Sequence, residues 1–280
     1  MTIAISLKVH DGVVLAADSA STLLAQTPAG VGVVNVYNNA NKIFNLCKGL
    51  PVGALTWGAG NIGASSTSTL AKDFRRRLSG EGEHAWKLDL DNYSVLSIAE
   101  RLCDFMFTEN YLDAFAEWPH KPAMGFMVCG YSSGSALAEE WQINIENGQC
   151  SGPFQMRALE DAGVTWNGDP EAITRLLFGM STVTPQVLTQ LGLQDRLDEI
   201  IAALRDAQIA PLVQAAMPIE DAADLAEFLV KTTARFNRYM PGADTVGGPI
   251  EVAAITKHEG FKWLHRKHYY SSTLNPEVRP

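Results

Sequence analysis

Residues 2–19 read TIAISLKVHDGVVLAADS, and this stretch decides the fold. From Ile3 to Val9 the large apolar residues occupy the odd positions, which is the period of a strand with one buried face. Asp11-Gly12 is a dipeptide typical of tight hairpin turns, and residues 13–17 form a second, more apolar strand. The stretch therefore predicts an antiparallel hairpin at the start of the chain.

Further strands and helices follow in blocks after a Gly/Pro/Asn-rich stretch over residues 26–41. The predicted strands cover residues 42–46, 52–57, 126–129, 141–145, 250–256 and 261–263, and the predicted helices lie within residues 64–78, 93–115 and 170–239. Because this order lacks a regular strand–helix–strand alternation, the predicted fold class is α+β with antiparallel sheets. No repeat or linker divides the chain, so residues 1–280 are expected to form a single domain.

Composition and charge exclude several classes of protein. With 280 residues, 46% hydrophobic and 19% charged, the chain is long enough and apolar enough for a globular core. A net charge of −9 argues against nucleic acid as a partner. No apolar run approaches the roughly 18 residues that a membrane span needs, and no secretory signal opens the chain. The four cysteines form no CxxC pair and are interpreted as buried, reduced thiols, so a cytoplasmic location is expected.

Two glycine-rich motifs suggest other chemistries. Residues 58–63 match the G-x-G-x-x-G fingerprint of dinucleotide-binding turns, but no second strand ending in an acidic residue follows. Residues 130–134 match G-x-S-x-G, the pattern of a hydrolase nucleophile elbow, but their flanks favour a hairpin turn. We therefore interpret the first motif as a tight strand-to-helix turn and the second as a hairpin turn, and we expect no cofactor and no metal.

The amino terminus offers a third possibility. Thr2 directly follows Met1, and removal of that methionine leaves a threonine with a free α-amino group. The reference pKa of such an amine, about 7.7–8.0, suits a general base near neutral pH. A single residue then supplies both the hydroxyl nucleophile and its base. Because one methionine precedes Thr2, no propeptide is expected.

Three pieces of sequence make the N-terminal third resemble the proteasome β-type family of N-terminal nucleophile hydrolases. They are Thr2 at the head of an alternating strand, the run from Asp11 to Ser19, and Asn41-Lys42-Ile43-Phe44. Agreement continues over residues 54–58, 124–130 and 246–252. The resemblance implies a four-layer αββα sandwich of two antiparallel sheets, the N-terminal nucleophile hydrolase fold. Residues 181–217, approximately, are then an extra helical insertion.

The resemblance also implies roles for individual residues. Thr2 is the expected nucleophile, Lys42 lies beside it, Asp18 keeps Lys42 charged, and the Gly58 N–H forms the oxyanion hole. Asn167 and Asp244 are expected to support the threonine amine, although the family more often has serine at the first position and aspartate one place away from the second. The expected substrate-binding residues are Ser21, Thr22, Phe44, Thr56 and Gly60.

By the same resemblance the chain is a self-compartmentalised threonine-type peptidase. Its expected partners are copies of itself, in a homo-oligomeric ring or double ring, and a peptide or polypeptide substrate. No regulatory ATPase is identified by the sequence. Two alternatives stay open: an N-terminal nucleophile amidase acting on a small amide, and a catalytically weak assembly or binding protein of the same fold.

Overall fold

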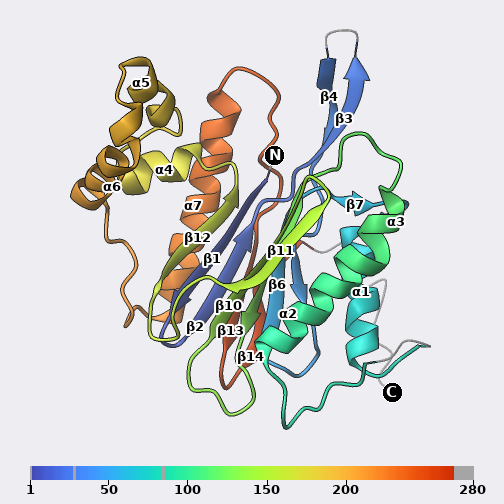
Figure 1. Cartoon of the computed structure of the whole chain (residues 1–280). Coiled ribbons are helices and arrows are strands. Elements are labelled where there is room, and N and C mark those ends of the chain that lie inside the picture. Colours follow the sequence, from blue (N-terminus) through green and yellow to red (C-terminus); the bar gives the residue numbers. More distant parts are fainter. Residues whose placement is uncertain (1, 28–29, 83–85, 268–280) are drawn as a thin grey trace.

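The computed structural model describes residues 2–27, 30–82 and 86–267 (Figure 1). A first five-stranded sheet is centred on the predicted N-terminal hairpin, and all its neighbouring strands are antiparallel. Its order is β12 (Gly163–Gly168), β1 (Ile3–Val9), β2 (Gly12–Ala17), β13 (Glu251–Thr256) and β14 (Gly260–His265). The hairpin predicted from residues 2–19 is therefore confirmed, with Ala4 opposite Ala17.

A second five-stranded antiparallel sheet packs against the first. Its order is β11 (Gln149–Gln155), β10 (Glu139–Glu146), β9 (Met124–Gly130), β6 (Val52–Gly58) and β5 (Ile43–Asn45). Side chains such as Ala4 and Leu15 from the first sheet meet Leu55 and Met127 from the second in one buried cluster. β1 is consequently buried on both faces, whereas its sequence predicted one, because this second sheet covers its even-numbered residues.

Helices cover the outer face of each sheet (Figure 1). The long helix α7 (Ile219–Tyr239) and the shorter α4 (Glu171–Phe178) pack on Ile3, Ile5 and Leu7 of β1. On the second sheet lie α1 (Thr67–Leu78) and α2 (Val95–Cys103), which is continued by a π-helix (Asp104–Tyr111) and α3 (Leu112–Ala114). The α+β class with antiparallel sheets is confirmed.

The Gly/Pro/Asn-rich stretch over residues 26–41 contains strands that the sequence did not predict. β3 (Ser21–Thr27) and β4 (Gly30–Tyr37) pair as a hairpin that projects from the body of the molecule (Figure 1). β-Branched residues such as Val33, Val34 and Val36 favour an extended backbone, and they outweigh the neighbouring Gly and Asn.

Both glycine-rich motifs occupy turns. The G-x-G-x-x-G residues lead from β6 through a small hairpin, β7 (Asn61–Ile62) and β8 (Ser65–Ser66), into α1. β6 pairs only with antiparallel neighbours among the described strands, so the motif lacks the parallel sheet of a dinucleotide-binding unit. The G-x-S-x-G residues connect β9 and β10, which confirms the predicted hairpin turn.

The region expected to be an insertion forms a separate helical lobe beside α4 and α7 (Figure 1). It contains α5 (Thr184–Gln190), a 3-10 turn (Gln194–Arg196) and α6 (Leu197–Gln208). The Ala210 N–H donates to the Leu177 carbonyl at 2.8 Å, and the Arg205 guanidinium lies 4.9 Å from the Phe178 ring centre. In the part of the chain that the structure describes, no helix is both long and apolar enough to cross a membrane.

Candidate active site

The end of β12 fixes the backbone of Thr2. Thr2 is buried at the head of β1, and its carbonyl accepts a hydrogen bond of 2.7 Å from the Asp169 N–H. Gly168 lies opposite Ile3 in the strand register and has φ of +104°, a conformation that side chains disfavour. A Cβ at Gly168 would overlap the Thr2 carbonyl oxygen, so only glycine allows this close approach.

Asp18 connects Thr2 to the rest of the site. Its side chain is buried and accepts four hydrogen bonds, two on each carboxylate oxygen. Oδ1 accepts from the Ile3 N–H at 3.0 Å and from Lys42 Nζ at 2.5 Å. Oδ2 accepts from the backbone N–H groups of Ala20 and Gly247, each at 3.0 Å. One carboxylate oxygen therefore joins the peptide that follows Thr2 to the ammonium of Lys42.

Lys42 is a buried lysine, and the carboxylate of Asp18 lies beside it. Burial lowers its pKa below the ordinary value of 10.5, while the charge and hydrogen bond of Asp18 raise it and the nearby Lys267 lowers it. Burial has the largest effect, so this ammonium gives up its proton more readily than an exposed lysine does. The Asp18–Lys42 pair, which is hydrogen-bonded to the peptide that follows Thr2, can therefore hold a proton or pass it on.

A second buried lysine, which the sequence did not suggest, supports this pair. Lys267 Nζ donates to Ser19 Oγ at 2.6 Å, to the Ala40 carbonyl at 2.7 Å and to Glu251 Oε2 at 2.8 Å. The Ala40 N–H also donates to the Ser19 carbonyl at 2.9 Å. These bonds close the long segment between Asp18 and Lys42, so that its two ends lie together.

Replacing Lys267 with methionine is expected to reduce the free energy of unfolding by about 3 kcal/mol, because Glu251 stays buried after losing its charged partner. Lys262→Met, on the exposed side of β14, removes the same charge and is the matched control, with an expected effect within about 0.5 kcal/mol. Urea denaturation of both variants measures the difference. Equal losses in the two variants would show that Lys267 does not hold the site together.

Asn167 and Asp244, which were expected to support the threonine amine, make other contacts in the structure. Asn167 lies opposite Ala4 in the strand register, on the face toward the second sheet, and its Nδ2 donates to Gln142 Oε1 at 3.4 Å. Asp244 is exposed, and its Oδ1 would lie 3.9 Å from a Cβ built on Gly247. Neither contact reaches Thr2.

Two residues that the sequence did not point to, Asp169 and Asn237, connect the backbone at Thr2 to the loop at residues 245–247. Asp169 Oδ2 accepts from Asn237 Nδ2 at 3.1 Å, and Asn237 Oδ1 accepts from the N–H groups of Thr245 at 3.0 Å and Val246 at 3.3 Å. The Thr245 hydroxyl is buried and has no hydrogen-bond partner among the described residues. Asn237 on α7 thus joins the end of β12 to the loop that also binds Asp18 through Gly247.

The residues expected to bind substrate divide into two groups. Gly58 and Gly60 are exposed at the end of β6, and a Cβ on Gly60 would lie 3.3 Å from Ser21 Oγ at the start of β3, next to Thr22. Phe44 is instead packed in the core beneath α1 and α2. The Thr56 hydroxyl is also buried and donates to the Gly125 carbonyl at 3.0 Å. The first group faces solvent beside β3, and the second lies in packed interior.

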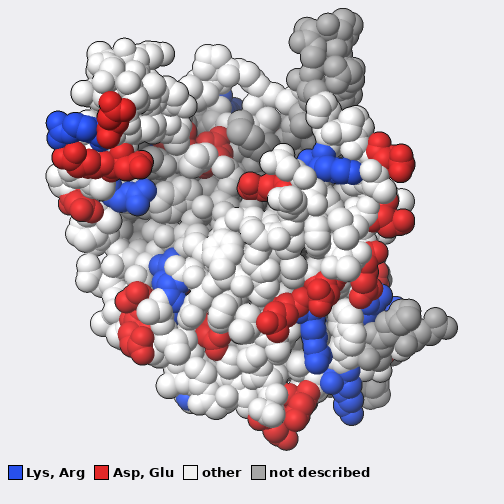
Figure 2. Space-filling view, viewed as in Figure 1, with Lys and Arg blue, Asp and Glu red and all other residues white. Residues whose placement is uncertain are grey.

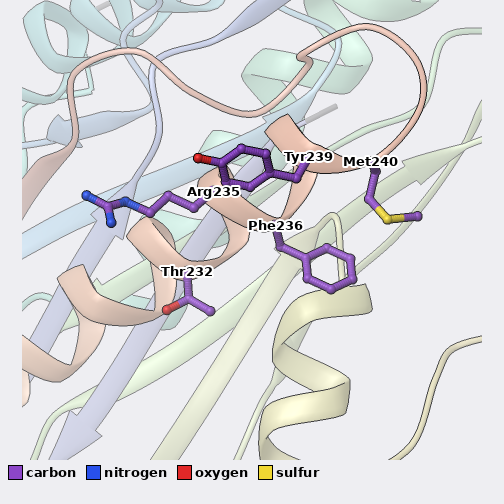
Figure 3. Close-up of a pocket in the computed structure, with 5 residues that line it drawn as sticks. All are labelled: Thr232, Arg235, Phe236, Tyr239 and Met240. Atoms are coloured by element: carbon purple, nitrogen blue, oxygen red, sulfur yellow. The ribbon is translucent and has the colours of Figure 1, made fainter.

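A hollow of about 400 Å³ lies on the outer surface of the last turns of α7, outside this site. Figure 3 shows its lining residues, with Arg235 and Tyr239 extending to one side and Phe236 and Met240 to the other. Asn237 is on the opposite, buried face of the same helix. Figure 2 shows acidic and basic side chains mixed around the rim of the visible face, whose centre is mostly uncharged.

Comparisons with known proteins identify the fold. No family model matches the chain, and no curated protein matches it. Among solved structures, the helical assembly of the Anbu complex from Pseudomonas aeruginosa has a TM-score of 0.53 and 16% identity, covering 98% of this chain and 89% of that one. The Anbu (Gly-1) mutant from Hyphomicrobium sp. strain MC1 has 0.50 and 16%, covering 95% and 86%. Anbu (ancestral beta-subunit) from Yersinia bercovieri has 0.48 and 14%, covering 96% and 89%.

The family inferred from the sequence is therefore wrong. The solved structures described above are Anbu proteins, a proteasome-like but distinct family, and no family model or curated protein supports membership of the proteasome β-type family itself. The short motifs around Asp18 and Lys42 do not separate one family from another within a shared fold. At 16% identity the likeness shows the fold alone.

Proposed function

We propose that this protein is a self-assembling hydrolase of Anbu-like fold in which Thr2, freed of Met1, attacks amide bonds. The two facing sheets with helices on both outer sides then form the αββα sandwich of N-terminal nucleophile hydrolases, and residues 1–280 form one domain with residues 181–217 inserted. The observation that carries the proposal is the Asp18 carboxylate, which bonds both the Ile3 N–H and Lys42. Met1 lies outside the described residues.

The mechanism follows from the groups around Thr2. The α-amino group of Thr2 accepts the proton of its own hydroxyl, whose oxygen attacks the substrate carbonyl carbon. Lys42 stabilises the alkoxide as it forms, and Asp18 keeps Lys42 in place. The Gly58 N–H stabilises the oxyanion of the tetrahedral intermediate. The protonated amine then gives its proton to the leaving nitrogen, and water hydrolyses the acyl-enzyme.

The substrate class proposed is an extended peptide. Ser21 and Thr22 at the start of β3 lie beside the exposed Gly58 and Gly60, so an extended chain between them gains backbone hydrogen bonds as an added strand. Phe44 and Thr56, which lie in the interior, are proposed to shape the pocket for a substrate side chain, and Asn167 and Asp244 to support the threonine amine.

We propose that the chain assembles with copies of itself. The Pseudomonas aeruginosa Anbu complex forms a helical assembly, and a chain of this fold can use the same principle, as an open helix or a closed ring. The helical lobe offers exposed apolar residues for such contacts, with Val183 at 54% and Leu191 at 68% exposure. An assembly that encloses its active sites in a chamber favours a peptide substrate over a small amide, because a small substrate needs no such chamber.

A catalytically weak assembly protein is the second candidate. It is favoured by the contacts of Asn167 and Asp244, because neither of these contacts involves Thr2. The labelling experiment below separates the two candidates, because an assembly protein needs no reactive Thr2.

Treatment of the purified protein with a peptide epoxyketone or β-lactone is expected to add one label per chain, on Thr2. Intact-mass analysis is expected to show loss of Met1 and a single adduct, which peptide mapping places at Thr2. Thr2→Ala is expected to remove the adduct, because the attacking hydroxyl is lost. Thr2→Ser keeps a hydroxyl and is expected to keep the label, and Thr189→Ala changes an exposed threonine as the control. Retention of Met1 or absence of an adduct would contradict the proposal.

A further inference from the structure

Two of the four cysteines lie against each other far from Thr2. Cys103 is the last residue of α2, and Cys150 is the second residue of β11, the edge strand of the second sheet. Their Sγ atoms are 2.9 Å apart, although 47 positions separate them in the chain. Both are free thiols, and both are half-buried, whereas Cys47 and Cys129 are buried as the sequence predicted.

The contact gives the two thiols different acidities. Either sulfur can donate the hydrogen bond between them; with Cys103 as the donor, the contact lowers the pKa of Cys150, while the contact and burial raise the pKa of Cys103. Cys150 is therefore the sulfur that more readily becomes a thiolate, and the thiolate is the form that reacts with oxidants. Cys103 lies beside it as a second thiol able to complete a disulfide.

We propose that Cys103 and Cys150 are a redox-active pair that closes reversibly into a disulfide when a hydroperoxide oxidises it. The Cys150 thiolate attacks one oxygen of hydrogen peroxide, and the O–O bond breaks to give a sulfenic acid and hydroxide. The Cys103 sulfur then attacks Cys150 Sγ, forming the S–S bond, and the sulfenic oxygen leaves as water. Two thiols and one hydrogen peroxide thus give one disulfide and two waters.

The disulfide would link the C-terminal end of α2 covalently to β11, the edge strand of the second sheet. A disulfide needs an S–S distance of about 2.05 Å, so the 2.9 Å contact closes with a small side-chain movement. The closed loop covers 47 positions, and restricting an unfolded loop of that length is expected to raise the melting temperature by about 5 °C. A dithiol reductant restores the two thiols. The pair does not contact Thr2, Asp18 or Lys42 in the described structure, so the inference does not depend on the proposed function.

The experiment uses the full-length protein, fully reduced and then treated with hydrogen peroxide at a few molar equivalents. Free thiols are alkylated, and the unreduced protein is cut after glutamate. Trypsin is unsuitable, because it releases residues 102–157 as a single peptide that contains both Cys103 and Cys150. Cleavage after glutamate places Cys103 in residues 101–109, Cys150 in residues 147–160 and Cys129 in residues 118–139. The expected product is peptide 101–109 joined to peptide 147–160, two mass units lighter than their sum and separated by dithiothreitol.

Cys103→Ser and Cys150→Ser are each expected to lose the joined peptide and the 5 °C rise, while Cys47→Ser keeps both. Peptide mapping of the unsubstituted protein tests for the Cys103–Cys150 disulfide even if a serine variant fails to fold. A joined peptide that dithiothreitol separates, with the rise in melting temperature, supports the proposal. Recovery of both peptides unjoined, as thiols or as sulfinic or sulfonic acids, overturns it. Joining of Cys150 to Cys47 or Cys129 instead also overturns it.

Discussion

Asp18→Asn is expected to reduce the free energy of unfolding by about 3–5 kcal/mol and to abolish labelling of Thr2. The carboxylate accepts two hydrogen bonds on each oxygen, and an amide can accept on only one of them. The amide NH₂ then faces two donors, and Lys42 stays buried without an opposite charge, which is strongly destabilising. Because Oδ1 holds the Ile3 N–H, the substitution also releases the peptide that positions Thr2.

The pH dependence of the same variant gives a second test. Asp18 raises the pKa of Lys42, so its loss moves that pKa further below the ordinary 10.5. Between the lowered folded pKa and 10.5 the unfolded chain binds more protons than the folded one, so stability rises with pH through this window. Denaturation at neutral pH and at pH near 9.5 is expected to show partial recovery of the lost stability. Asp73→Asn on the exposed face of α1 is the control, and a loss no larger than its own would contradict the prediction.

The sequence pointed to Asp18 and Lys42 through the family resemblance, and local patterns explain where the structure places them. Alternation over residues 3–9 and the Asp11-Gly12 turn determine the strand register, which puts Ala17 opposite Ala4 and Asp18 next to the start of β1. The Ile3 N–H then meets the carboxylate by geometry alone. Lys42 heads β5, whose pairing with β6 follows from an equally clear hydrophobic pattern.

Lys267 and Asn237, which hold distant segments together around the site, could not be predicted in the same way. Lys267 meets Ser19 across 248 positions, and a lysine after the last strand has no pattern that distinguishes it from an exposed one. Asn237 is a polar residue on the buried face of a long helix, and only the packing of α7 shows which backbone groups it meets. The same reason explains why the contact of Asn167 with Gln142 could not be predicted. In β12, which the sequence did not predict as a strand, alternation turns its side chain toward the second sheet and leaves Gly168 and Asp169 at Thr2.

Gly168→Ala is expected to reduce the free energy of unfolding by at least about 3 kcal/mol and to slow labelling of Thr2 by roughly 100-fold. One part of the cost is conformational, since φ of +104° disfavours any side chain by about 1–2 kcal/mol. The other part is steric, because the added Cβ overlaps the Thr2 carbonyl oxygen and pushes Thr2 from its place. A displacement of about 1 Å at a reacting group can reduce the rate by about 100-fold.

Gly49→Ala separates these two parts. Gly49 has φ of +87°, close to that of Gly168, but a Cβ there meets no atom within 4 Å. This variant is therefore expected to lose only the conformational part of the free energy of unfolding, about 1–2 kcal/mol. Its Thr2 is expected to be labelled at the same rate as in the unsubstituted protein. The difference between the two variants in urea denaturation and in labelling rate measures the contact with Thr2. If both variants lose equal stability and keep the same labelling rate, Gly168 contributes only its backbone conformation, and the close approach of β12 does not position Thr2.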